Sequence, residues 1–263
     1  MNKLQTIVAV FAVSVNTGAA AQEVTVRMGT EGYYPPFNYF DSAGQIKGFD
    51  IDIGNALCEK MKVKCEWVTT DWEGIIPALN ANKFDTIVAS MSITDERSKI
   101  VSFTEPYYFN PGQFVTAKDS GLKGAMPSDL TGKTIGTQSG TLEVKVLEQY
   151  FPESEIQLYP TLDDSLLDLE TGRVDAVYAS AFVLADWLAT ETGSCCNFVG
   201  QMFREKSNKG TGIAVRKDDE DLRIALNKAL AEIMADGTYE EIRSRYFDFD
   251  IMSKPVLASE LFK

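Results

Sequence analysis

The pattern of apolar and polar positions divides the chain into alternating strands and helices. Val24, Val26 and Met28 alternate with polar neighbours, which is typical of a strand with one buried face. From Phe49 onwards apolar residues recur at helical spacing, and a short apolar strand segment follows. A similar succession of strand and helix begins again near Thr134. This alternation predicts an α/β fold.

Two short segments of the chain match each other. Residues 85–90 read Asp-Thr-Ile-Val-Ala-Ser, and residues 175–180 read Asp-Ala-Val-Tyr-Ala-Ser. Each segment follows a leucine-containing helical pattern by a short turn. This internal correspondence predicts two lobes of related design, each of which places the polar end of a strand toward a common cleft. A chance similarity between two α/β units is the alternative.

Irregular segments mark where the chain is expected to pass between the lobes. Residues 109–112 and 207–210 lack apolar periodicity, and both contain glycine. We therefore expect lobe 1 to comprise residues 22–108 and 211–263, and lobe 2 to comprise residues 113–206. The two crossings would form the hinge.

The first 21 residues have the features of a secretory signal peptide. Lys3 supplies a basic start, residues 4–15 are mostly apolar, and three alanines ending at Ala21 offer a cleavage site. The apolar stretch is too short for a membrane-spanning helix, which needs about 20 apolar residues. We therefore expect cleavage after Ala21 and export of a soluble chain to the periplasm.

Composition excludes several classes of function. The formal net charge of −13 makes the chain a poor candidate for binding nucleic acid or anionic lipid. The sequence has no histidine, which removes Ser-His and Cys-His catalysis and histidine metal sites. No metal or cofactor is expected, and binding is favoured over catalysis. Carboxylates are plentiful, so an acid–base pair stays open as an alternative.

Four cysteines in an exported chain favour disulfides over metal binding. Cys58 and Cys65 enclose a short connection between a predicted helix and a predicted strand, so a local bridge between them is expected. Cys195 and Cys196 are adjacent. They could form a vicinal disulfide, pair with other cysteines or stay reduced, and the sequence leaves these alternatives open.

Candidate anion-binding groups gather where the strand that ends at Ala89 gives way to a loop. Ser90 and Ser92 follow the strand, and Arg97 follows a predicted helix start. An arginine can hold a carboxylate with two parallel hydrogen bonds, and N–H groups at a helix start favour negative charge. Further donors are expected from a helix start across the cleft, at Gln138, Ser139, Gly140 and Thr141. A site for a ligand carboxylate is predicted, with a solvated loop and ordinary helix capping as the alternatives.

Two aromatic residues are placed like the walls of a pocket. Tyr34 precedes two prolines, Trp72 stands at a predicted helix start, and together they can flank a planar or cationic group. Glu31, in the same loop as Tyr34, can pair with a cation at the far end of the ligand. Core packing is the alternative for the aromatics. Glu143 is interpreted as a surface acid that complements the dipole of its helix.

Four motifs, in order through essentially all of the chain that follows residue 21, resemble a known family: residues 29–37 (GTEGYYPPF), 48–53 (GFDIDI), 92–97 (SITDER) and 236–239 (DGTY). They resemble the polar amino-acid-binding proteins of bacterial ABC importers, solute-binding protein family 3. Within it the chain is most similar to binders of histidine, of lysine/arginine/ornithine and of opines. The resemblance implies a type II periplasmic-binding-protein fold with two crossing strands as a hinge. It also implies a monomeric receptor that closes over a small-molecule ligand and delivers it to an inner-membrane ABC permease.

The resemblance implies roles for individual residues. Arg97 takes the α-carboxylate of the ligand with help from Ser92 and Thr141. Tyr34 and Trp72 flank the ligand side chain, and the position of Glu31 matches the acidic residue for a distal cation. The spacing of Cys58 and Cys65 is similar to the disulfide of the basic amino-acid binders.

One departure from the family concerns the ligand's nitrogen. The family usually has an aspartate for the α-ammonium group where this chain has Ser180, and a buried cation without an anionic partner is costly. An arginine-derived opine such as octopine carries a second carboxylate beside that nitrogen, which a serine hydroxyl accepts. An opine is therefore expected, with free arginine, lysine, ornithine or histidine as alternatives. Cyclohexadienyl dehydratases share the fold and are the enzyme alternative.

Overall fold

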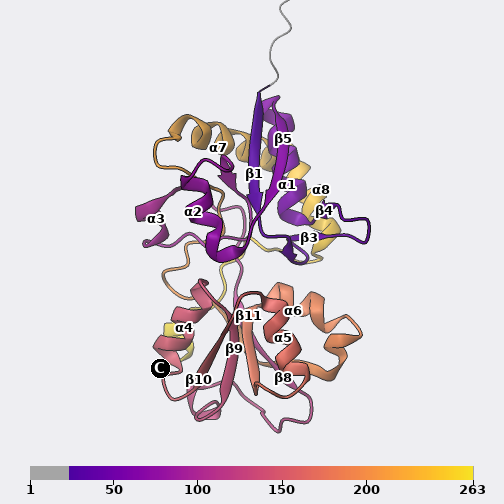
Figure 1. Ribbon diagram of the computed structural model, residues 1–263, viewed down its shortest axis with the longest axis vertical. Helices are drawn as coiled ribbons and strands as arrows, with labels where there is room; N and C mark the ends of the chain where they lie inside the picture. The colour runs from indigo at the N-terminus through magenta and orange to yellow at the C-terminus, as the bar shows by residue number, and fades with distance from the viewer. Residues whose placement is uncertain (1–23, 263) are drawn as a thin grey trace, which may run out of the picture.

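The computed structural model describes residues 24–262 and consists of two α/β lobes joined by crossing segments (Figure 1). The two-lobed architecture predicted from the sequence is confirmed. The predicted signal peptide lies outside the described residues.

Lobe 1 is built on a five-stranded sheet with the strand order β5-β1-β6-β13-β7. Strand β1 (Thr25–Thr30) pairs in parallel with β5 (Lys64–Thr69) and with β6 (Thr86–Ile87). Strand β13 (Ala214–Val215) runs antiparallel to β6 and to β7 (Ser102–Phe103). The late strand β13 belongs to this sheet because the chain has returned from lobe 2.

Lobe 2 repeats this design with the strand order β10-β9-β11-β8-β12. Strand β9 (Thr134–Gln138) pairs in parallel with β10 (Glu155–Tyr159) and β11 (Ala176–Ser180). Strand β8 (Gly112–Ala117) runs antiparallel to β11 and to β12 (Cys196–Phe203). The parallel strands of both lobes end toward the cleft between them (Figure 1).

Helices pack against both sheets (Figure 1). In lobe 1, α1 packs against the two late helices α7 and α8. The helices of lobe 1 are α1 (Phe49–Met61), α2 (Ile75–Asn80), α3 (Arg97–Ile100), α7 (Glu220–Ala235) and α8 (Thr238–Tyr246). Those of lobe 2 are α4 (Leu142–Tyr150), α5 (Leu162–Glu170), α6 (Ala181–Leu188) and α9 (Ala258–Leu261).

Shorter elements complete the chain. A small antiparallel sheet of β2, β3 and β4 follows β1 and carries part of the site. Its strands are β2 (Tyr33–Tyr34), β3 (Asn38–Phe40) and β4 (Ile46–Lys47), and the 3-10 helices are η1 (Trp72–Gly74), η2 (Pro127–Asp129) and η3 (Thr192–Cys195).

The two matching sequence segments form equivalent hydrogen bonds in the two lobes. In lobe 1 the backbone N–H of Arg27 in β1 donates to the Asp85 carboxylate at 3.0 Å. In lobe 2 the backbone N–H of Thr134 in β9 donates to the Asp175 carboxylate at 2.9 Å. Each aspartate directly precedes the strand that lies third in its sheet order, β6 or β11. The matching aspartates therefore tie corresponding strands together in the two lobes.

The end of the chain departs from the predicted boundaries. Residues 211–263 were expected in lobe 1, but α9 packs on lobe 2, where Ala258 belongs to the buried cluster around Phe114 and Phe151. The ring centroid of Phe262 lies 5.3 Å from that of Phe151 and 4.9 Å from that of Phe203. Burial of these apolar side chains draws the segment after α8 across the hinge, which adds a third passage to the two that were expected.

Both disulfides join nearby residues. The predicted bridge between Cys58 and Cys65 is present and ties α1 to β5, with a Cα–Cα distance of 5.9 Å. Cys195 and Cys196 are bonded to each other, which decides among the alternatives that the sequence left open. No cysteine among residues 24–262 is free.

Candidate ligand-binding site

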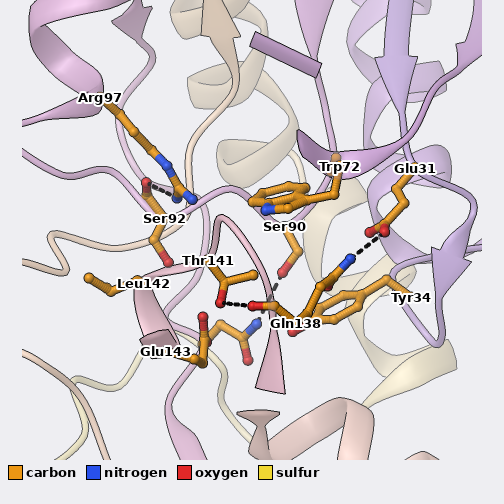
Figure 2. Close-up of a pocket in the computed structure, with 12 residues that line it drawn as sticks. Glu31, Tyr34, Trp72, Ser90, Ser92, Arg97, Gln138, Thr141, Leu142 and Glu143 are labelled. Carbon is orange, nitrogen blue, oxygen red and sulfur yellow. Dashed lines mark hydrogen bonds between the residues drawn. The ribbon is translucent and has the colours of Figure 1, made fainter. Parts of the chain in front are cut away.

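A pocket with about 370 Å3 of empty space, part of it open to solvent, lies between the lobes. Its walls come from segments that follow β1, β5 and β6 in lobe 1, from the first crossing, and from the end of β9 and the start of α4 in lobe 2 (Figure 2). Most of the predicted ligand-binding residues line it, namely Glu31, Tyr34, Trp72, Ala89, Ser90, Ser92, Arg97, Gln138 and Thr141. Their contact with a ligand stays a prediction.

Arg97 is the first residue of α3, and its guanidinium is held from two sides. It donates to the backbone oxygen of Ser92 at 3.0 Å and, across the cleft, to that of Gly140 at 3.3 Å. The guanidinium carbon lies 5.3 Å from the ring centroid of Trp72. An arginine has five N–H donors, so donors remain for a ligand carboxylate. Burial lowers the pKa of Arg97 from its ordinary value, and the nearby Glu143 opposes that shift.

Glu31 lies directly after β1 and is buried, with 6% of its surface exposed. Its carboxylate accepts a hydrogen bond from the Gln138 side chain of lobe 2 at 2.6 Å (Figure 2). Burial raises the pKa of Glu31 to about 7, and the bond from Gln138 opposes this rise. A cationic ligand group next to Glu31 would stabilise its charged form and lower its pKa.

Tyr34 and Trp72 form two walls of the pocket. Tyr34 belongs to β2 and Trp72 begins η1, and Figure 2 shows their rings on opposite sides of the space next to Glu31 and Gln138. Two aromatic faces beside a carboxylate suit a flat cation such as a guanidinium, which can stack and donate hydrogen bonds at its edge.

A buried polar network supports the wall formed by Ser90. The backbone N–H of Ser90 donates to the Asp50 carboxylate at 2.7 Å, and its hydroxyl accepts from the side chain of Asn110 at 3.0 Å. Ser180 in turn donates to Asn110 at 2.5 Å. Because Asn110 lies in the first crossing, the network connects the end of α1 nearest the cleft to the end of β11 in lobe 2.

Three predicted residues do not line the pocket. Ser139 donates its backbone N–H to Tyr159 within lobe 2 at 2.8 Å, and Gly140 meets Arg97 only through its backbone oxygen. Ser180 is fully buried, and its hydroxyl accepts the N–H of Val183 at 3.3 Å in addition to its bond with Asn110. The expected contact between Ser180 and the second carboxylate of an opine therefore lacks a free hydroxyl at the pocket surface.

Three lining residues were missed, namely Asn110, Leu142 and Glu143. The interpretation of Glu143 as a surface acid was wrong, since its side chain points into the pocket (Figure 2). The sequence could have predicted Leu142 and Glu143 as lining residues, because they directly follow the donors predicted at that helix start. Asn110 gave only the weaker signal of a polar residue at a predicted crossing.

The fold and the cleft define a two-lobed solute-binding protein of the type II periplasmic class. Residues 26–249 match the bacterial extracellular solute-binding proteins, family 3, and the chain belongs to this family.

Two curated relatives and one solved structure are similar over most of their length. The L-arginine-binding protein of Pseudomonas aeruginosa is 40% identical over 236 residues, which cover 88% of this chain and 91% of that protein. The lysine/arginine/ornithine-binding periplasmic protein of Escherichia coli is 36% identical, with the same shares covered. An ancestral arginine-binding protein bound to arginine superposes with a TM-score of 0.80 at 34% identity, covering 86% of this chain and 100% of the other.

Among residues 24–262, none of the helices is long and apolar enough to cross a membrane. The same residues contain no group of three or more side chains arranged to hold a metal ion.

Proposed function

We propose that the chain is a monomeric periplasmic receptor of an ABC importer, which captures a ligand with an arginine-type side chain and delivers it to an inner-membrane permease. Membership of the solute-binding family and the similarity to two amino-acid-binding proteins support the receptor role. The same relatives favour binding over turnover as the chain's activity. The enzyme alternative predicts turnover of prephenate or arogenate, and loss of either compound on incubation with the protein would overturn the binding proposal.

The pairing of charges at two ends of the pocket carries this proposal. Arg97 faces one end with unused donors, and Glu31 lies at the other end beside Tyr34 and Trp72. A ligand that joins a carboxylate to a guanidinium satisfies both ends. A lysine-type ammonium gains less from the flat walls, because it cannot stack as a plane.

Isothermal titration calorimetry with arginine, lysine, histidine, octopine and agmatine tests the proposal. Arginine is expected to bind at one site per chain, and agmatine, which lacks the carboxylate, is expected to bind far more weakly. At roughly 100 times its dissociation constant, a ligand also stabilises the fold by about 2.7 kcal/mol in a thermal-shift assay. Absence of binding by every guanidinium compound in the panel would overturn the proposed ligand class.

Closure is expected to show in solution scattering. Contacts between the lobes in this structure include Glu31 with Gln138, Arg97 with Gly140, and the ion pair of Glu96 with Lys145. Saturating arginine is expected to lower the radius of gyration measured by small-angle X-ray scattering. A radius that does not change would contradict closure upon binding.

Arginine affinity is expected to rise with pH between about 5.5 and 7. The pKa of Glu31 is about 7 in the free protein, and a bound guanidinium lowers it, so binding below pH 7 must release a proton. One released proton changes the dissociation constant by about tenfold per pH unit in this window. The acids Asp71 and Asp163 contribute to the raised pKa of Glu31, and Glu143 also has a raised pKa.

Calorimetry in buffers of different ionisation enthalpy measures the proton release. Glu31→Gln, which cannot titrate, is the matched variant and is expected to bind arginine more weakly with a flatter pH profile. An equally steep profile in Glu31→Gln would assign the titration to another group.

A further inference from the structure

We infer that Glu143 holds the α-ammonium group of the ligand and thereby selects a free amino acid over an N-substituted opine. This inference rests on the proposed function and specifies its ligand further. It assigns to α4 the anionic partner that Ser180 at the end of β11 cannot supply.

Glu143 is placed to face the same space as Arg97. It is the second residue of α4, a helix that starts at the cleft after Thr141, and it lines the pocket from lobe 2 while Arg97 lines it from lobe 1 (Figure 2). The carboxylate and the ammonium of an amino acid are attached to one carbon atom, so their partners must border the same space. Arg97 and Glu143 meet this requirement.

Glu143 lies in the first turn of α4, where the backbone N–H groups at the start of the helix favour a negative charge. Burial raises the pKa of Glu143, while the backbone N–H groups at the helix start and the charge of Arg97 oppose this rise. The start of α4 therefore favours an anion at the edge of the pocket, and a carboxylate has lone pairs for an ammonium group.

The charges that line the pocket match a free basic amino acid. Arg97 is the one cationic side chain among the described lining residues, and Glu31 and Glu143 are the two acids. Free arginine brings one carboxylate and two cationic groups, which complements this set group by group. Octopine brings a second carboxylate next to its nitrogen, where Glu143 would repel it.

Ser180 does not offer the alternative contact that the sequence indicated. Ser180 does not line the pocket and is fully buried, and its hydroxyl donates to Asn110 at 2.5 Å and accepts the N–H of Val183 at 3.3 Å. A second ligand carboxylate would therefore find no free serine donor. The geometry thus favours a free amino acid over an opine, the reverse of the preference that the sequence indicated.

Calorimetry on Glu143→Gln with two ligands tests this inference. Arginine and Nα-acetylarginine share the guanidinium and the carboxylate, but the acetylated compound has no α-ammonium charge. We expect wild-type protein to prefer arginine. In Glu143→Gln, arginine affinity is expected to fall about tenfold to a hundredfold, as for loss of a charge-assisted hydrogen bond, while Nα-acetylarginine stays within about threefold. Octopine is expected to bind the variant more tightly than wild type.

Glu148→Gln is the matched control, because it makes the same chemical change on an exposed position of the same helix. It is expected to leave both affinities unchanged. Retained binding of Nα-acetylarginine by Glu143→Gln also shows that the pocket is folded.

Three results would overturn the inference, and they separate it from the proposed function. Equal weakening of both ligands in Glu143→Gln would show a merely structural role. Wild-type protein that binds octopine but not arginine would refute the role of Glu143 and leave the receptor function intact. Wild-type protein that binds no guanidinium compound would refute the proposed function and the inference together.

Discussion

Replacement of Arg97 by alanine is expected to weaken arginine binding by about 30-fold to several thousandfold. Truncating one partner of a buried, hydrogen-bonded charge pair costs about 2–5 kcal/mol, and each 1.4 kcal/mol is a factor of ten in affinity. The loss is large because Arg97 is the one cationic side chain among the described residues that line the pocket, so the ligand carboxylate would keep no charged partner. Calorimetry with arginine measures the change.

Two further variants separate charge from geometry at Arg97. Arg97→Lys keeps the positive charge but loses the planar fork that can donate two parallel hydrogen bonds, so it is expected to recover only part of the affinity. Arg173→Ala removes an exposed arginine that pairs with Asp168 on lobe 2 and is expected to bind arginine like wild type. Agmatine affinity is expected to be the same in Arg97→Ala and wild type, because agmatine has no carboxylate. Arginine affinity within about threefold of wild type in Arg97→Ala would contradict the assignment.

Local sequence was enough to find the residues that lie at the ends of parallel strands. Glu31, Ser90 and Gln138 each stand at or soon after the carboxyl end of a strand, and parallel strands bring such positions to one edge of a sheet. The matching segments 85–90 and 175–180 predicted that two such edges face each other. The fold therefore followed from the periodicity and the internal correspondence.

The sequence predictions that were wrong concern positions whose role depends on packing between the lobes. Ser180 occupies the predicted strand end, but its hydroxyl turns to Asn110 of the crossing instead of the pocket. Glu143 looked like an acid that complements its own helix, and its place in the first turn of α4 agrees with that. What the sequence could not show is that Arg97 of the other lobe closes over the same helix start, which turns a capping acid into a lining residue.

The end of the chain was misplaced for a related reason. The segment after α8 contains many apolar residues but shows no clear period, and three apolar side chains near its end, Ala258, Leu261 and Phe262, pack on lobe 2. Such a short segment can cover an apolar surface on either lobe. The choice depends on distance and shape, which the pattern of apolar residues in the sequence does not show.

Asp50→Ala is expected to lower the free energy of unfolding by about 3–5 kcal/mol. The carboxylate of Asp50 is fully buried and accepts the hydroxyls of Tyr107 at 2.6 Å and Tyr108 at 3.2 Å, besides the N–H of Ser90. Each buried donor left without a partner costs about 1–3 kcal/mol. Arginine affinity is expected to fall as well, because Ser90 holds a left-handed backbone with φ of 51° that its bond to Asp50 supports.

Urea unfolding of the ligand-free protein at several pH values measures the effect of Asp50. Burial raises the pKa of Asp50 to about 6, above its ordinary value of 3.8. Between these values the native state binds more protons than the unfolded state, so this group makes the free energy of unfolding decrease as pH rises from about 4 to 6. Asp50→Asn removes this titration and keeps one oxygen to accept the tyrosine hydroxyls.

Asp50→Asn is therefore expected to lose less stability than Asp50→Ala and to show a smaller decrease in stability between pH 4 and 6 than wild type. Its amide nitrogen faces the N–H of Ser90 in place of an oxygen, so the bond that supports the pocket wall is lost in both variants. We accordingly expect arginine affinity to fall in Asp50→Asn even where most of the fold's stability remains. Wild-type affinity in Asp50→Asn would show that Ser90 keeps its position without Asp50, and would limit the role of Asp50 to stability.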